Sequence, residues 1–166
     1  MFSHPSKCLN LDKKNMSGNT DYFNINIHLT EEHRLIQMAT RDWVNKFVKP
    51  IIEDHFQKEE TPTDLIKELS EIGAFGLILP QEYGGIGADF ISFGLMMQEL
   101  ERGDSSIRVI SSIQTSLVMY AIYKFGSEEQ RNKYLPKLAT GEMLGAFGLS
   151  ASVPRGLRLK FLCLVS

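Results

Sequence analysis

The sequence predicts an all-α domain that is followed by the first strand of a β domain. Apolar residues recur at helical spacing in four or five segments between residues 29 and 141, and glycine, proline or helix-capping residues separate these segments. The periodicity changes after Gly141, where "MLGAFGLS" has the composition of a strand. With 166 residues and 43% hydrophobic content, the chain is long enough for one domain with a sizeable core.

The first helix is expected to begin just after Leu29, with Thr30 as its N-cap. Glu31 and Glu32 would lie in the first turn, where carboxylates interact favourably with the helix dipole. The helix is expected to stop or kink near Pro50, because proline has no N–H to donate to the helical ladder. Its expected apolar face comprises Ile36, Ala39, Trp43 and Phe47.

A glycine-rich connection separates the second and third helices. The second helix follows "ETPTD" and ends at Gly73, and the third begins near Phe90. The connection "FGLILPQEYGGIGAD" matches neither the Walker pattern nor GxGxxG, and its paired glycines suit a tight turn between helices. The expected apolar faces comprise Leu65, Leu69 and Ile72 in the second helix and Phe90, Phe93, Met97 and Leu100 in the third.

The fourth helix is expected at about residues 107–125, and the fifth follows it directly. Ser127 and Gln130 have the spacing of a capping box, and the fifth helix is expected to end before Gly141. The expected stripe of the fourth helix comprises Ile107, Ile110, Gln114, Leu117 and Ala121. Apolar surface of the third and fourth helices is expected to be exposed.

The chain is expected to divide into a flexible leader at 1–28 that ends in an extended segment, the helical domain at 29–141 and the start of a β domain at 142–166. A single strand leaves its backbone groups unsatisfied. We expect no hairpin partner for the first strand in the alternating tail "LRLKFLCLV". Residues 142–166 are therefore interpreted as a truncated β domain with an atypical tail.

Charge and composition exclude several classes of partner. The net charge of -2 arises from 18 basic and 20 acidic residues without a strongly biased block, which disfavours nucleic acid and membrane surfaces as partners. No apolar run approaches the roughly 18–20 residues of a membrane span, and no secretory signal is evident. Cys8 and Cys163 lie near opposite ends, which indicates a reducing, intracellular compartment.

The titratable residues indicate neither a metal site nor an acid–base pair. The histidines have no metal-ligand spacing with cysteine or carboxylate, and we expect them on the surface. Glu99 and Glu101 are two residues apart on a helix and therefore do not share a face. The histidines are His4, His28, His33 and His55.

Arg108 stands at the head of a long run of apolar and small polar residues, "IRVISSIQTSLVMYAIYKF". A buried, unpaired guanidinium would be very unfavourable. Arg108 must therefore reach water from the helix end, pair with a carboxylate such as Glu101, or bind an anionic ligand. Spacing alone leaves these alternatives open.

Several segments together resemble the N-terminal part of the acyl-CoA dehydrogenase family. They are "LPQEYGGIG", "MMQELERGDSSIR", "SLVMYAIYKFGSEEQRNKYLPKLATGE" and "GAFGLS". Within the family, "ELERGDSSIR" followed by "SLVMYAIYKFGSEEQ" is most similar to glutaryl-CoA dehydrogenases. The resemblance runs from about residue 29 to residue 150, and the family's N-terminal domain is helical.

The resemblance implies a set of binding residues. In glutaryl-CoA dehydrogenases an arginine binds the distal carboxylate of the glutaryl group, a glutamate orients that arginine and a serine assists; the matching positions are Arg108, Glu101 and Ser112. The family commonly places serine directly after the arginine, and Val109 stands here instead. The FAD-contacting strand of the family matches Phe147, Gly148, Leu149 and Ser150, after which the family's EP and GSD motifs do not follow.

The resemblance also implies the reaction and its partners. Family members transfer electrons from an acyl-CoA to FAD and on to an electron-transfer flavoprotein, and glutaryl-CoA is additionally decarboxylated to crotonyl-CoA. The intact relatives are homotetramers, cytoplasmic in bacteria or alternatively in the mitochondrial matrix. Because the family's catalytic base and most of its flavin pocket have no counterpart in this sequence, we expect an inactive fragment. The alternative is a non-catalytic helical binding or interaction module.

Overall fold

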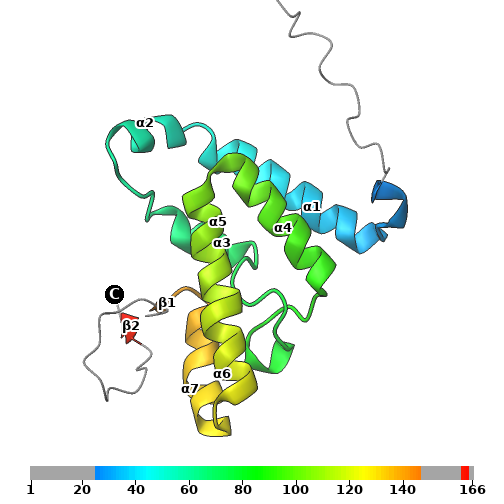
Figure 1. The fold of residues 1–166 in the computed structure, drawn as a ribbon, viewed down its shortest axis with the longest axis vertical. Coiled ribbons are helices and arrows are strands. Elements are labelled where there is room, and N and C mark those ends of the chain that lie inside the picture. The colour runs from blue at the N-terminus through cyan, green and yellow to red at the C-terminus, as the bar shows by residue number, and fades with distance from the viewer. Residues whose placement is uncertain (1–24, 147–161, 165–166) are drawn as a thin grey trace, which may run out of the picture.

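The computed structural model describes residues 25–146 and 162–164, and side-chain contacts are described for residues 25–146. Helices dominate the described part, as the sequence predicts, and a small two-stranded sheet lies beside them (Figure 1). The elements in chain order are η1 (Ile25–His28), α1 (Glu31–Trp43), η2 (Val44–Val48), α2 (Ile52–Gln57), α3 (Leu65–Glu71), η3 (Gln81–Tyr83), α4 (Phe90–Gly103), α5 (Ser105–Ser112), η4 (Ile113–Met119), α6 (Tyr120–Phe125), α7 (Glu128–Ala139), β1 (Leu144–Ala146) and β2 (Leu162–Leu164).

Helix α1 begins at the predicted cap. The Thr30 side chain accepts a hydrogen bond from the His33 backbone N–H, and His33 Nδ1 accepts one from the Thr30 backbone N–H. His33 therefore takes the part that glutamate or glutamine plays in a capping box. The expectation of a surface histidine is wrong here, because His33 is buried and also bonds Asp89. The extended segment expected before α1 is also wrong, since Ile25–His28 forms a 3₁₀ turn.

The first helix stops at the predicted place. Helix α1 continues into the π-helical segment η2, which ends at Val48, and Pro50 lies in the turn that follows. The short helix α2 comes after this turn and was not expected. In Figure 1, α1 and α4 lie side by side. The long helix formed by α5, η4 and α6 begins where α4 ends and runs away from this pair.

The fourth predicted helix is continuous from Ser105 to Phe125, but its centre, η4, is π-helical. The wider turn of an i→i+5 segment shifts the buried face. Met119, which lies outside the expected stripe, is therefore buried, whereas Leu117 within it is 44% exposed. Gln114 is buried, as its place in the stripe predicts. The expected exposure of apolar side chains on the third and fourth helices is confirmed at Phe90, Ile91, Val109 and Leu117.

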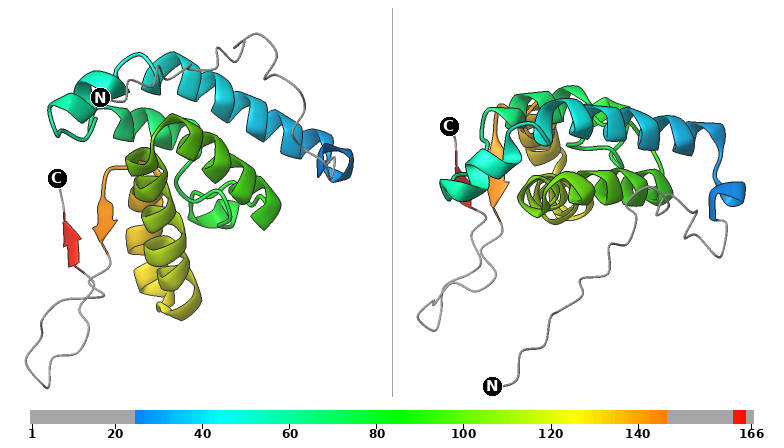
Figure 2. Two further views of the ribbon diagram at one scale, coloured as in Figure 1. Left: turned by 45° about the horizontal axis from the view of Figure 1, so that its top comes forward. Right: turned by 90° about the horizontal axis from the view of Figure 1, so that it is seen from above.

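The C-terminal part of the described chain contains one confirmed cap and one corrected strand. Ser127 and Gln130 form the predicted capping box of α7, and Gly141 has a φ of 73° just beyond its end. Strand β1 pairs antiparallel with β2, with Gly145 opposite Cys163 (Figure 2). The expectation that β1 has no hairpin partner is thus wrong. The alternating tail supplies the backbone groups that β1 needs.

One continuous core joins these helices. Trp43 and Val44 from the first helix pack with α4, while Met119 and Leu135 connect η4 to α7. Within the described residues, no helix has both the length and the apolar content to cross a membrane. The largest fully buried apolar side chains are Phe75, Leu69, Leu77, Leu79, Leu100, Ile107, Met119, Leu135, Leu138 and Val44.

Candidate functional site

The candidate site lies where α4 ends and α5 begins. The Asp104 carboxylate oxygen Oδ1 accepts hydrogen bonds from the Ser106 and Ile107 backbone N–H groups at 2.8 and 3.3 Å, which caps α5 immediately after α4. A Cβ on Gly103 would lie 2.6 Å from Val44 Cγ1, so glycine permits the close packing of this junction on η2. The end of α4 and the first turns of α5 are thereby held together.

Arg108 and Glu101 form an ion pair across this junction. Arg108 Nε donates to Glu101 Oε2 at 2.7 Å, and Ser105 Oγ donates to Glu101 Oε1 at 2.8 Å. The pair is partly exposed, at 34% for the Arg108 side chain and 48% for that of Glu101. The Arg108 guanidinium, and after it the Ser105 hydroxyl, lowers the pKa of Glu101 below its usual value. Of the alternatives left open for Arg108, pairing with Glu101 is thus observed.

The terminal nitrogens of Arg108, Nη1 and Nη2, have no hydrogen-bond partner among the described residues, where only Nε is engaged. Ser112 is half-buried one helical turn beyond Arg108. In the described part of the chain no hydrogen bond joins the Ser112 hydroxyl to Arg108 or Glu101, although its carbonyl accepts one from Ser116 Oγ at 2.6 Å. The structure therefore brings Arg108 and Glu101 together, and among the described residues it does not join Ser112 to either of them by a hydrogen bond.

A second cluster, of one buried carboxylate and two arginines, was not predicted from the sequence. Glu99 is 1% exposed, and it accepts hydrogen bonds from Arg41 Nη2 at 2.6 Å and Nε at 3.1 Å and from Arg102 Nε at 2.8 Å. Burial would raise the pKa of Glu99, but the two guanidinium groups outweigh it and the pKa is lowered. Arg41 lies 58 positions from Glu99, so sequence spacing offers no signal of this contact.

The helix that carries Arg108 also exposes apolar side chains. Val109 is 36% exposed and Leu117 is 44% exposed. Near the other end of the same helix, Phe90 of α4 packs edge-on against Tyr120, with ring centroids 6.2 Å apart. The same helix therefore carries a partly exposed cation and exposed apolar side chains.

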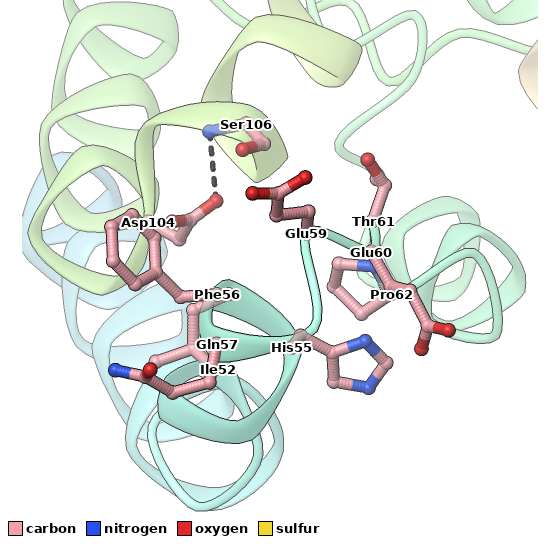
Figure 3. Close-up of a pocket in the computed structure, with 10 residues that line it drawn as sticks. All are labelled: Ile52, His55, Phe56, Gln57, Glu59, Glu60, Thr61, Pro62, Asp104 and Ser106. Atoms are coloured by element: carbon pink, nitrogen blue, oxygen red, sulfur yellow. Dashed lines mark hydrogen bonds between the residues drawn. The ribbon is translucent and has the colours of Figure 1, made fainter.

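Two pockets in the described part of the chain lie away from Arg108. The first, of about 550 Å³, lies between α2, residues 59–62 and the start of α5 (Figure 3). The Glu59 carboxylate points toward the start of α5, where Asp104 and Ser106 lie (Figure 3). No lysine or arginine lines this pocket, so it does not suit the phosphates of FAD or coenzyme A.

The second pocket, of about 670 Å³, includes one lysine, Lys67, together with Asp64 and Glu142. It is therefore also unsuited to a pyrophosphate. The predicted flavin contacts Phe147, Leu149 and Ser150 lie outside the described residues. Among the described residues, no group of histidine, cysteine and carboxylate side chains could hold a metal ion.

These observations define an all-α domain with a partly exposed arginine–glutamate pair at a helix junction and a β-strand after its last helix. The profile of the acyl-CoA dehydrogenase N-terminal domain matches residues 30–142. The chain belongs to the acyl-CoA dehydrogenase family, and the predicted resemblance is confirmed.

Individual relatives show the same similarity. The chain is 39% identical over 124 residues to an acyl-CoA dehydrogenase of Bacillus subtilis strain 168, covering 75% of this chain and 33% of that protein. It resembles the crystal structure of a glutaryl-CoA dehydrogenase from Mycobacterium smegmatis in complex with FADH2, with 39% identity and a TM-score of 0.71; the match covers 74% of this chain and 31% of that one. It also resembles the structure of butyryl-CoA dehydrogenase from Megasphaera elsdenii, with 31% identity and a TM-score of 0.71; the match covers 75% of this chain and 33% of that one. The chain therefore spans about a third of the length of the relatives it matches.

Proposed function

We propose that this chain supplies the acyl-binding helices of an FAD-dependent acyl-CoA dehydrogenase whose substrate carries a terminal carboxylate. The substrate proposed is glutaryl-CoA, which would be dehydrogenated between its α and β carbons and decarboxylated to crotonyl-CoA. Arg108 would bind the distal carboxylate, Glu101 would orient Arg108, and Ser112 would contribute a hydroxyl from the next turn. Both glutaryl-CoA and butyryl-CoA dehydrogenases are similar to this chain, so the proposal depends on the site itself.

The observation that carries the proposal is the single-point pairing of Arg108. Its Nε donates to Glu101, while Nη1 and Nη2 have no hydrogen-bond partner among the described residues. A planar guanidinium with two such nitrogens matches the two oxygens of a carboxylate. Glu101 keeps the cation paired in the absence of ligand. The exposed side chains of Val109 and Leu117 on the same helix would contact the methylene groups of the acyl chain.

The cofactor and protein partners are proposed from family membership. FAD would contact Phe147, Leu149 and Ser150, and neither pocket described above fits its pyrophosphate. An electron-transfer flavoprotein would accept the electrons, and the full-length enzyme is proposed to be a cytoplasmic homotetramer.

A binding experiment tests the assignment of Arg108. Calorimetric titration of the chain with glutaryl-CoA and with butyryl-CoA would compare the parent, Arg108→Gln and the control Arg34→Gln. Arg34 is an exposed arginine in the first turn of α1, and its Nη2 donates to the Asn26 carbonyl. Loss of a charge-assisted pair predicts at least about tenfold weaker binding of glutaryl-CoA by Arg108→Gln, with butyryl-CoA unaffected. Equal binding of the two ligands by the parent would refute the proposed specificity.

A non-catalytic protein-binding module remains the second candidate. Exposed aromatic side chains favour it, notably Phe56 at 77% and Phe125 at 89%. In thermal denaturation with FAD, glutaryl-CoA and butyryl-CoA, such a module would show no shift of the melting temperature, because only ligands that bind the folded state stabilise it. A shift with glutaryl-CoA alone would favour the first proposal.

A further inference from the structure

We infer that Ser105 is a positioning residue for carboxylate recognition: its hydroxyl occupies one oxygen of Glu101 and thereby leaves Nη1 and Nη2 of Arg108 open to a ligand. This inference rests on the proposed function, because it concerns the same site. Ser105 is distinct from Arg108, Glu101 and Ser112, the residues that the family resemblance implies.

Two arginine–glutamate pairs in the same molecule show what Ser105 changes. Arg41 binds Glu99 as a fork, with Nε donating to Oε2 and Nη2 donating to Oε1. Arg108 binds Glu101 at one point, Nε to Oε2. The second oxygen of Glu101 accepts the hydrogen bond from Ser105 Oγ instead. A second donor weakens the arm of a fork that ends on the same oxygen: Glu99 Oε2, which also binds Arg102, lies 3.1 Å from Arg41 Nε, whereas Oε1 lies 2.6 Å from Arg41 Nη2. At Glu101 the Ser105 hydroxyl is such a second donor, on Oε1. We attribute the missing second arm of the Arg108 pair to this competition.

The backbone holds Ser105 in the required place. Ser105 is the first residue of α5, directly after Asp104, whose side chain caps the helix. Its side chain therefore reaches back across the junction to Glu101, four positions earlier on α4. The cap restrains this geometry without using the Ser105 side chain, so the hydroxyl can be removed while the backbone stays in position.

Other neighbouring groups do not take this role. Arg102, next to Glu101 in sequence, is engaged with Glu99 Oε2 and with Asn45 Oδ1. Within the described residues, Arg108 and Ser105 are the groups that contact the Glu101 carboxylate. The pKa of Glu101 lies below its ordinary value because Arg108, and after it Ser105, donates to its carboxylate. An anionic Glu101 freed from Ser105 would be able to close a fork on Arg108.

The consequence is competition between Glu101 and the ligand. In Ser105→Ala, Oε1 of Glu101 would be free to accept from a terminal nitrogen of Arg108. If about 80–90% of molecules adopt this closed fork, the apparent affinity for a terminal carboxylate falls about five- to tenfold, because only the open fraction binds. A ligand without a terminal carboxylate would be unaffected.

The test is calorimetric titration with glutaryl-CoA and butyryl-CoA of the parent chain, Ser105→Ala and Ser105→Thr. Glutaryl-CoA is expected to bind Ser105→Ala about five- to tenfold more weakly than the parent. Ser105→Thr, which keeps a hydroxyl, should restore parental binding. In a Glu101→Gln background, Ser105→Ala should change nothing further, since glutamine has no second anionic oxygen to close the fork.

The outcomes separate the two proposals. If the parent prefers glutaryl-CoA but Ser105→Ala binds it equally well, the role of Ser105 is wrong and the proposed function stands. If Ser105→Ala weakens binding to the same extent in the Glu101→Gln background, its effect is general and the inference is also wrong. If the parent shows no preference, both proposals fail. Without any ligand, arginine side-chain ¹⁵N NMR should show slower rotation of the Arg108 guanidinium in Ser105→Ala, and unchanged rotation would contradict the closed fork.

Discussion

Replacing Gln114 by methionine should remove three hydrogen bonds that hold β1 and the end of α7 against the long helix. Gln114 Nε2 donates to the carbonyls of Leu138 and Met143, each at 2.8 Å, and Oε1 accepts from the Gly145 backbone N–H at 2.8 Å. The Gln114 side chain is buried. Methionine preserves its length and approximate volume but can replace none of these bonds.

The expected loss of stability follows from these contacts. Each hydrogen bond contributes about 1 kcal/mol net, and a buried backbone group left without a partner costs about that much or more. Leu138 and Met143 are buried and Gly145 is half-buried, so water would compensate at most part of the loss. We therefore expect the free energy of unfolding to fall by about 3 kcal/mol. This is a large fraction of the roughly 5–15 kcal/mol typical of a folded domain.

Urea denaturation provides the assay. The protein contains one tryptophan, and Trp43 is buried in the core, so its fluorescence reports unfolding. The transition should move to lower urea with an unchanged slope. Gln98→Met is the matched control, since Gln98 is exposed on α4 and the same substitution there should leave the midpoint within error.

Hydrogen exchange gives a local check on the same prediction. In Gln114→Met the amide proton of Gly145 should exchange through local opening, at a higher rate than global unfolding alone would give, because its hydrogen-bond acceptor is gone. A loss of stability below about 0.5 kcal/mol, together with unchanged exchange at Gly145, would refute the reasoning. It would show that Gln114 does not restrain β1 in solution.

Two further predictions concern a close backbone contact and an acid-sensitive cap. A Cβ on Gly145 would overlap the Val118 side chain, so Gly145→Ala should lower the melting temperature and a second change, Val118→Ala, should restore part of it; additive losses would contradict this. The Ser92 backbone N–H, and then His33, lower the pKa of Asp89 from 3.8 to about 2. Because the folded value is depressed, the stability that Asp89 contributes is present above about pH 4 and lost as the pH falls toward 2. Asp89→Asn should therefore lose less stability than the parent between pH 5 and pH 2 in urea titrations, and parallel losses would show that Asp89 does not contribute.

Local signals predicted much of the fold. Thr30 and Ser127 are helix caps as expected, and the first helix ends before Pro50. Gly141 stands beyond the last helix with a positive φ. Such features depend on a few neighbouring residues, because caps and breaks act through backbone groups within one turn.

The candidate site could be predicted only in part. The Arg108–Glu101 pair was anticipated as one alternative, because an unpaired guanidinium would be very unfavourable if buried and Glu101 is a nearby carboxylate. The single-point geometry of that pair and the part played by Ser105 were not anticipated. They depend on how Asp104 turns the chain between α4 and α5. The angle of this turn has no periodic signature in the sequence.

The sequence by itself determined which segments form helices, where most of them begin and end, and to which family the chain belongs. The tertiary structure alone decided that Arg41 meets Glu99 across 58 positions, that β1 pairs with β2, and that η4 turns Leu117 outward. The physical reason is range. Capping and periodicity act within a few residues, whereas ion pairs, strand pairing and the phase of a buried face depend on partners that only the folded chain brings together.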